Sequence, residues 1–128
     1  MNESQTPSGT ADNRPWPTEL RLTDQGQLLV ISFNDGAQFR LRAEYLRVES
    51  PSAEVQGHGI GQKKLVTGKQ DVAISNIEPV GNYAARLLFS DGHDSGLFTW
   101  DYLHELGNEH DGRWADYLAK VTEAGLAR

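Results

Sequence analysis

Alternating hydrophobic and polar positions predict a series of short antiparallel strands joined by tight turns. Residues 28–33 form a nearly continuous apolar run, which is typical of a strand covered on both faces. Asn34-Asp35-Gly36 follows as a hairpin signal, because an Asp-Gly pair readily adopts positive φ. In residues 37–42 apolar side chains then alternate with polar ones, as in a half-exposed strand.

Later segments repeat this strand pattern. Further strands are expected over residues 19–23, 72–78, 82–89 and 95–98. Pro79 is expected to end the second of these, because proline cannot donate a backbone hydrogen bond to a neighbouring strand.

Helical spacing replaces alternation near the end of the chain. A short helix is expected over residues 100–106, with Thr99 as its cap and Gly107 as its end. The last helix is expected to begin near Asp111 and to end at Gly125, because apolar residues between them recur at helical intervals.

Two stretches of the sequence resemble each other. Residues 28–49 and residues 86–106 both run as a strand, a Phe-x-Asp-Gly turn, a second strand and a Tyr-Leu helical turn. One such unit cannot bury its own apolar face, so two would pack together or extend one sheet. The alternative is that hairpins simply favour Asp-Gly. Both interpretations predict an α+β fold, with antiparallel β-hairpins in small sheets, short helices and a C-terminal helix.

The length of 128 residues fits one domain with its own core. Residues 1–17 are too polar to bury enough apolar surface and are expected to be a disordered tail, with Trp16 docking on the domain. Residues 18–108 would form the body, and residues 109–128 a C-terminal helix packed on it. Residues 49–71 would form a long loop, and such loops are usually functional or mobile.

Composition excludes several classes of function. The chain has no cysteine, which excludes disulfides, thiol catalysis and cysteine-bound metals and fits a cytoplasmic protein. The net charge of −6 argues against binding nucleic acid or an anionic membrane. We expect neither a signal peptide nor a membrane-spanning segment, because residues 1–17 lack an apolar stretch and no run of 18 apolar residues occurs.

A glycine-rich segment is the first candidate site. It runs from Gly57 through His58, Gly59 and Gly61 to Lys64. The segment lacks the Gly-Lys-Ser/Thr of a phosphate-binding loop and the third glycine of a dinucleotide fingerprint. A flexible loop is therefore the simpler interpretation. The alternative is a nest of backbone amides that binds an anion or nucleotide beside two adjacent lysines.

An acidic turn is the second candidate site. Asp91, His93 and Asp94 could join His58 in a metal site or in a small enzyme's active site. Asp and Gly are, however, what any hairpin turn favours, and His93 could simply form local hydrogen bonds. The sequence contains neither His-x-Asp/Glu nor His-Glu-x-x-His, so the common iron and zinc motifs are absent. No cofactor is expected.

Five segments carry a family resemblance: residues 45–55, 57–59, 77–84, 89–96 and 100–103. In these segments the chain resembles the DUF971 family, also described as the γ-butyrobetaine hydroxylase-like N-terminal domain. The resemblance covers roughly residues 19–108.

The resemblance implies a zinc module with three cysteines and one histidine. The histidine corresponds to His93, and the three cysteines correspond to Ser50, Ser52 and Val55. Because none of these three residues supplies a thiolate, no metal is expected at His93 in this chain.

The resemblance also implies partner proteins. Similar domains are fused to iron- and 2-oxoglutarate-dependent hydroxylases and to P-loop ATPases that carry iron–sulfur clusters. A domain attached to different enzymes is more easily a docking module than a catalyst. We therefore expect a non-catalytic module that binds a protein partner in iron–sulfur or cofactor-related metabolism. Its binding surface would combine the glycine loop 56–64 with the turn 91–95.

Overall fold

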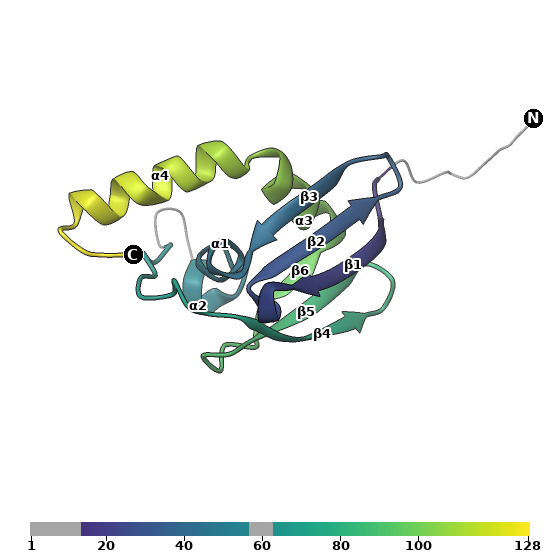
Figure 1. The fold of residues 1–128 in the computed structure, drawn as a ribbon, viewed down its shortest axis with the longest axis horizontal. Coiled ribbons are helices and arrows are strands. Elements are labelled where there is room, and N and C mark those ends of the chain that lie inside the picture. Colours follow the sequence, from purple (N-terminus) through teal and green to yellow (C-terminus); the bar gives the residue numbers. More distant parts are fainter. Residues whose placement is uncertain (1–13, 57–62) are drawn as a thin grey trace, which may run out of the picture.

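The structure, a computed structural model, describes residues 14–56 and 63–128. Its first half is a three-stranded antiparallel sheet followed by a helix (Figure 1). The sheet order is β1-β2-β3. The elements are β1 (Pro17–Thr23), the 3-10 turn η1 (Asp24–Gly26), β2 (Leu28–Phe33), β3 (Gln38–Arg42) and α1 (Ala43–Val48).

The second half has the same order of elements and adds one helix. A second antiparallel sheet, β4-β5-β6, is followed by α3 and then by α4. The elements are α2 (Ala53–Gln56) between the halves, β4 (Ile74–Val80), β5 (Ala84–Phe89), β6 (Leu97–Thr99), α3 (Trp100–Asn108) and α4 (His110–Glu123). The predicted α+β fold with two small antiparallel sheets is confirmed.

The core lies between the two sheets and includes side chains from both. The predicted central strand is confirmed, because Leu29, Val30 and Ile31 of β2 are at most 2% exposed. The largest core cluster contains Leu29, Ile31, Phe33, Leu41, Ala43, Tyr45, Leu46, Val72, Ile74, Ala85, Leu87, Phe89, Phe98, Leu103 and Leu106. Burial of this apolar surface is the dominant stabilising contribution to the fold.

Two predicted boundaries are wrong. Pro79 lies inside β4, where it pairs with Ala85. Because β4 is an edge strand, its outer side needs no ladder hydrogen bond and tolerates proline. Gly107 lies inside α3, which continues to Asn108. The ring of Phe39 packs so closely on the helix at Gly107 that a side chain there would overlap it. This glycine therefore permits close packing and does not end the helix.

The two halves make reciprocal hydrogen bonds. The Tyr45 hydroxyl in α1 donates to the Leu106 carbonyl in α3 at 2.7 Å. The Tyr102 hydroxyl in α3 donates to the Glu49 carbonyl after α1 at 2.5 Å. The two tyrosines are 57 positions apart in the sequence, and so are the two residues whose carbonyls accept. The second bond is therefore the equivalent of the first, with the two halves exchanged.

The two Phe-x-Asp-Gly turns are also equivalent. Gly36 and Gly92 have φ values of +90° and +91°, and each donates its N–H to the phenylalanine carbonyl three residues earlier. The Asp35 carboxylate contacts His104 of α3 at 2.8 Å, and the Asp91 carboxylate contacts Arg47 of α1 at 2.9 Å. Each half thus supplies a side chain that holds the turn of the other half, and the internal similarity is a structural repeat.

The C-terminal helix α4 passes over α1 (Figure 1), where Val48, Tyr117 and Val121 form a second, smaller core cluster. Beyond α4, Arg128 makes two hydrogen bonds, of 3.0 and 3.1 Å, to the Glu44 carboxylate. Glu44 is only 1% exposed, so this ion pair compensates a buried charge and ties the end of the sequence to α1.

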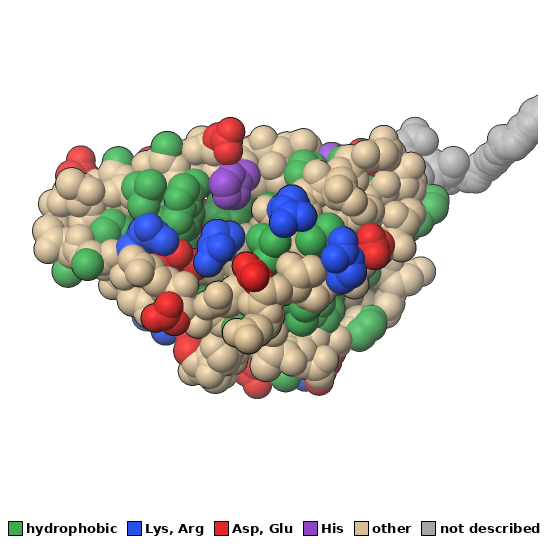
Figure 2. Space-filling view, viewed as in Figure 1, with side chains coloured by type: hydrophobic (Ala, Val, Ile, Leu, Met, Phe, Trp, Pro, Cys, Tyr) green, Lys and Arg blue, Asp and Glu red, His purple; other side chains and the backbone are tan. Residues whose placement is uncertain are grey.

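The surface carries no continuous basic area on the face drawn in Figure 2. Lys and Arg side chains lie singly across the middle of this face, and hydrophobic side chains gather over the end that α4 forms. Within the described residues, no helix is long and apolar enough to cross a membrane.

Candidate functional site

The turn between β5 and β6 places the imidazole of His93 inside the protein. His93 is 8% exposed. Its Nε2 atom lies 2.9 Å from the Ser50 hydroxyl and 3.3 Å from the Ser52 hydroxyl. Both serines belong to the segment between α1 and α2. The turn in the second half is therefore attached to the end of the first half through one imidazole and two hydroxyls.

Tight packing fixes the position of the Ser50 hydroxyl. Its Oγ atom lies 3.3 Å from the Oγ of Ser52. A Cβ atom at Gly96 would lie 2.5 Å from the same Ser50 Oγ. Position 96 therefore requires glycine for a close approach between segments. With Ser50 fully buried, its hydroxyl cannot serve as a nucleophile toward a dissolved substrate.

Two basic side chains neutralise the carboxylate of Asp91. Arg47 and Lys69 approach its Oδ2 atom at 2.9 and 2.6 Å, and the backbone N–H of His93 donates to Oδ1 at 3.1 Å. Burial raises the pKa of Asp91, but the bonds from Lys69, the His93 backbone and Arg47 outweigh it and hold the pKa at about 2. Asp91 is therefore an ionised structural anchor at any physiological pH.

The guanidinium of Arg47 depends on this anchor. Its side chain is 12% exposed, and its Nη1 atom is buried without a hydrogen-bond partner in the described part of the chain. Loss of the Asp91 carboxylate would leave a largely buried cation beside Lys69 with no compensating charge.

Replacement of Asp91 by asparagine is expected to lower the free energy of unfolding by about 2 kcal/mol at neutral pH. The folded-state pKa of about 2 lies below the ordinary value of 3.8, so the stabilisation is complete above pH 4. It is lost as the pH falls from the ordinary value through about 2, because below that pH the carboxylate is protonated in both states. Urea titrations of the wild type and the Asp91→Asn variant should therefore differ at pH 7 and converge toward pH 2.

Asp94 supplies the matched control, because it lies in the same turn and is exposed. An Asp94→Asn variant should unfold close to the wild type at pH 7, because its carboxylate is exposed. A constant difference between Asp91→Asn and the wild type from pH 7 down to pH 2 would show that the carboxylate's charge does not stabilise the turn.

The structure brings together some of the predicted site residues. Asp91 and His93 share one hydrogen-bonded cluster, whereas Asp94 is exposed. Gly57, His58, Gly59 and Gly61 lie outside the described residues, so the predicted contact between this loop and the turn stays a prediction. Within residues 14–56 and 63–128, no group of three or more His, Cys, Asp or Glu side chains is arranged to hold a metal ion.

Sequence reasoning missed Arg47 and Lys69. Both are far from Asp91 in the sequence, and isolated basic residues carry no motif. The internal repeat offered one usable signal, because Arg47 occupies the position equivalent to His104. Each of these side chains contacts the turn aspartate of the other half.

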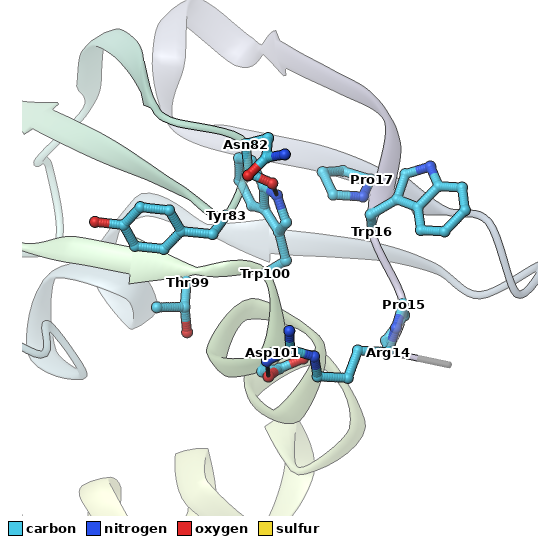
Figure 3. Close-up of a pocket in the computed structure, with 9 residues that line it drawn as sticks. All are labelled: Arg14, Pro15, Trp16, Pro17, Asn82, Tyr83, Thr99, Trp100 and Asp101. Atoms are coloured by element: carbon cyan, nitrogen blue, oxygen red, sulfur yellow. Dashed lines mark hydrogen bonds and ion pairs between the residues drawn. The ribbon is translucent and has the colours of Figure 1, made fainter. Parts of the chain in front are cut away.

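A cleft lies at the opposite end of β5. It has a volume of about 590 Å³ and is open to solvent beside the start of β1 (Figure 3). Its lining is aromatic and proline-rich, with one residue of each charge: Arg14, Pro15, Trp16, Pro17, Asn82, Tyr83, Thr99, Trp100 and Asp101. It contains no pair of side chains typical of acid–base or nucleophilic catalysis.

Comparison with known families identifies the chain. The model of the family described as "Gamma-butyrobetaine hydroxylase-like, N-terminal" matches residues 20–104. The chain belongs to this family. The match extends from β1 into α3, so it includes both halves of the repeat and the turn that holds His93. Among curated proteins none matches.

Solved structures of similar proteins match most of the chain. Two proteins with NMR solution structures are 49% and 46% identical to this chain, with TM-scores of 0.77 and 0.78. The alignments cover 88% and 98% of this chain, and 89% and 91% of the other chains. A DUF971-family protein of unknown function from Acidithiobacillus ferrooxidans, solved by crystallography, is 41% identical with a TM-score of 0.60. That alignment covers 71% of this chain and 91% of the other.

The zinc ion that the family resemblance implies does not fit the residues present. Structural zinc takes four ligands, which are thiolates or imidazoles in most sites. Around His93 this GBBH-like domain offers two neutral hydroxyls, and the third corresponding position, Val55, is a buried apolar side chain. The hydroxyls bind the imidazole instead, so hydrogen bonds occupy the place that the resemblance assigns to a metal.

Proposed function

We propose that this domain is a cytoplasmic, non-catalytic docking module that presents the turn 91–95 to a protein partner. The observation that carries the proposal is that some side chains of this turn are held by the rest of the domain while others are exposed. The side chains of Asp91 and His93 are held by four side chains from other segments, and the Asp91 side chain is only 21% exposed, whereas Asp94 and Ser95 are exposed. The turn is thus a rigid surface feature that presents the Asp94 carboxylate to solvent.

Rigidity favours binding, because a preorganised segment loses little conformational entropy when it enters a complex. The Asp91 carboxylate receives charged hydrogen bonds from two separate elements, and His93 bridges to a third segment. None of these side chains is arranged for catalysis: the Ser50 hydroxyl is buried and Asp91 is neutralised by basic residues. Docking therefore explains the arrangement better than an active site does.

The partner is expected to present a basic surface. The chain carries a net charge of −6, and Asp94 adds an exposed carboxylate to the turn. Complementary charge steers association and selects among partners. A P-loop ATPase with an iron–sulfur cluster is the partner to test, because the family resemblance implies fusion of similar domains to such enzymes.

Binding can be measured with the purified chain and the iron–sulfur P-loop ATPase encoded by the same organism. Biolayer interferometry should detect complex formation by the wild type. Asp94→Arg should weaken binding at least about tenfold, since the substitution reverses a charge within the interface. Glu123→Arg, the same charge reversal on the exposed end of α4, is the matched control and should change the affinity less than about twofold.

Equal weakening by the two variants would show that net charge, and not the turn, governs the interaction. Absence of binding by the folded wild type would exclude this ATPase as the partner and overturn the proposal.

A further inference from the structure

A rigidly held tryptophan projects from the start of β1. The backbone N–H of Trp16 donates to the Asn34 side chain at 2.8 Å, and the N–H of Asn34 donates to the Trp16 carbonyl at 2.9 Å. Pro15 and Pro17 restrict the backbone on either side. Trp16 is nevertheless 52% exposed. Its backbone is therefore fixed while a large apolar ring faces water.

The cleft described above lies directly beside this ring. Trp100, whose indole N–H donates to the Asn82 carbonyl at 2.8 Å, lines the cleft together with Tyr83, which is 50% exposed. Figure 3 shows the rings of Trp16 and Tyr83 pointing in opposite directions, away from the space between them. The volume of about 590 Å³ is ample for an incoming aromatic side chain.

Charges of both signs border the same cleft. Arg14 and Asp101 lie 3.6 Å apart, and their side chains are 70% and 54% exposed. An ion pair this exposed contributes little to the stability of one molecule. Either partner can therefore exchange its counter-ion for one on another molecule at small cost.

We propose that this cleft binds a second copy of the chain, with Trp16 of each copy entering the cleft of the other. A two-fold symmetric interface needs a self-complementary patch. This patch has a projecting ring beside a cavity and one charge of each sign, so Arg14 of one copy meets Asp101 of the other. The interface lies at the end of β5 remote from the turn 91–95 and goes beyond the docking function proposed above.

The dimer is expected to be weak. Stable interfaces bury about 800 Å² on each partner, and one exchanged tryptophan with its immediate neighbours covers less. Trp16 should supply most of the affinity, because aromatic anchors dominate small interfaces. Self-association should therefore appear in sedimentation equilibrium from about 10 µM to about 1 mM protein. Trp16→Ala should raise the dissociation constant at least about tenfold.

Leu126 provides the control, because it is also 52% exposed but does not line the cleft. Leu126→Ala should leave the dissociation constant within about twofold of the wild type. A monomer throughout the concentration range, or equal effects of the two substitutions, would overturn the proposal.

A mixing experiment tests the exchanged ion pair. Arg14→Glu and Asp101→Arg should each abolish dimers, because like charges then meet across the interface and also within each chain. An equimolar mixture should form heterodimers. In these, the new carboxylate at position 14 of one variant meets the new guanidinium at position 101 of the other, while the unchanged Arg14 and Asp101 form the second pair.

Contacts within one chain would not be restored by mixing, so a mixture that stays monomeric contradicts the intermolecular pair. Neither experiment involves the ATPase, so this proposal and the docking proposal can fail separately.

Discussion

Replacement of Ser50, Ser52 and Val55 by cysteine is expected to convert this domain into a zinc protein. The Ser50 and Ser52 Oγ atoms already lie 2.9 and 3.3 Å from the Nε2 atom of His93. A cysteine sulfur at either position would start close to the point that a tetrahedral ion occupies. Three thiolates and one imidazole form a standard structural zinc site, for which we expect a dissociation constant below about 100 nM.

Competition with a chromogenic chelator measures this affinity, and elemental analysis gives the stoichiometry. The triple variant should bind one zinc ion, and its melting temperature should rise on zinc addition. The same variant with His93→Ala is the control and should bind zinc far more weakly. If the folded triple variant binds no zinc, the correspondence of Ser50, Ser52 and Val55 with the family's cysteine positions is wrong.

Replacement of Gly26 by alanine is expected to destabilise the fold strongly. Gly26 ends η1 with φ at +87°, and a Cβ atom there would lie 2.5 Å from the Ile74 carbonyl oxygen of β4. The variant therefore combines left-handed strain of about 1 kcal/mol with a backbone collision between the two sheets, which adds about 1–3 kcal/mol. We expect a total loss of about 3 kcal/mol in the free energy of unfolding, measured by urea titration.

Gly36 separates the two contributions. Its φ is +90°, but apart from its two sequence neighbours no atom of the described residues lies within 4 Å of the position that a Cβ would take. Gly36→Ala should therefore cost only the strain, about 1 kcal/mol. Equal destabilisation by both variants would mean that β4 moves aside freely and that Gly26 does not fix the spacing between the halves.

Local signals in the sequence predicted the repeated unit well. The Asp35-Gly36 and Asp91-Gly92 pairs specify their turns through positive φ and an aspartate that accepts a backbone N–H two residues later. The cap of α3 was equally local, since the Thr99 hydroxyl accepts from the Tyr102 N–H at 3.1 Å.

The contacts between the halves could not be predicted in the same way. The bonds from Tyr45 to Leu106 and from Tyr102 to Glu49 depend on how two helices pack, which no spacing in the sequence encodes. Gly107 illustrates the same point. The preference for glycine at helix ends predicted that α3 stops there, whereas the residue lies inside the helix and allows the Phe39 ring of β3 to pack on it.

The candidate site was only partly predictable for a related reason. The turn chemistry predicted local hydrogen bonds for the His93 imidazole, whereas its bonds to Ser50 and Ser52 span 43 and 41 positions of the sequence. The family resemblance, in contrast, singled out the positions of both serines. Arg47 and Lys69 could not be found, because a salt bridge between distant elements leaves no pattern in a single sequence. The glycine-rich segment that carries His58 lies outside the described residues, so its part in the site stays a prediction.

Elemental analysis of tag-free protein, combined with thermal unfolding before and after EDTA treatment, tests most directly whether hydrogen bonds alone hold the imidazole of His93. The bonds from Ser50 and Ser52 predict metal well below one equivalent and an unchanged melting temperature after chelation. One equivalent of a transition metal, lost on chelation together with several degrees of melting temperature, would contradict this conclusion.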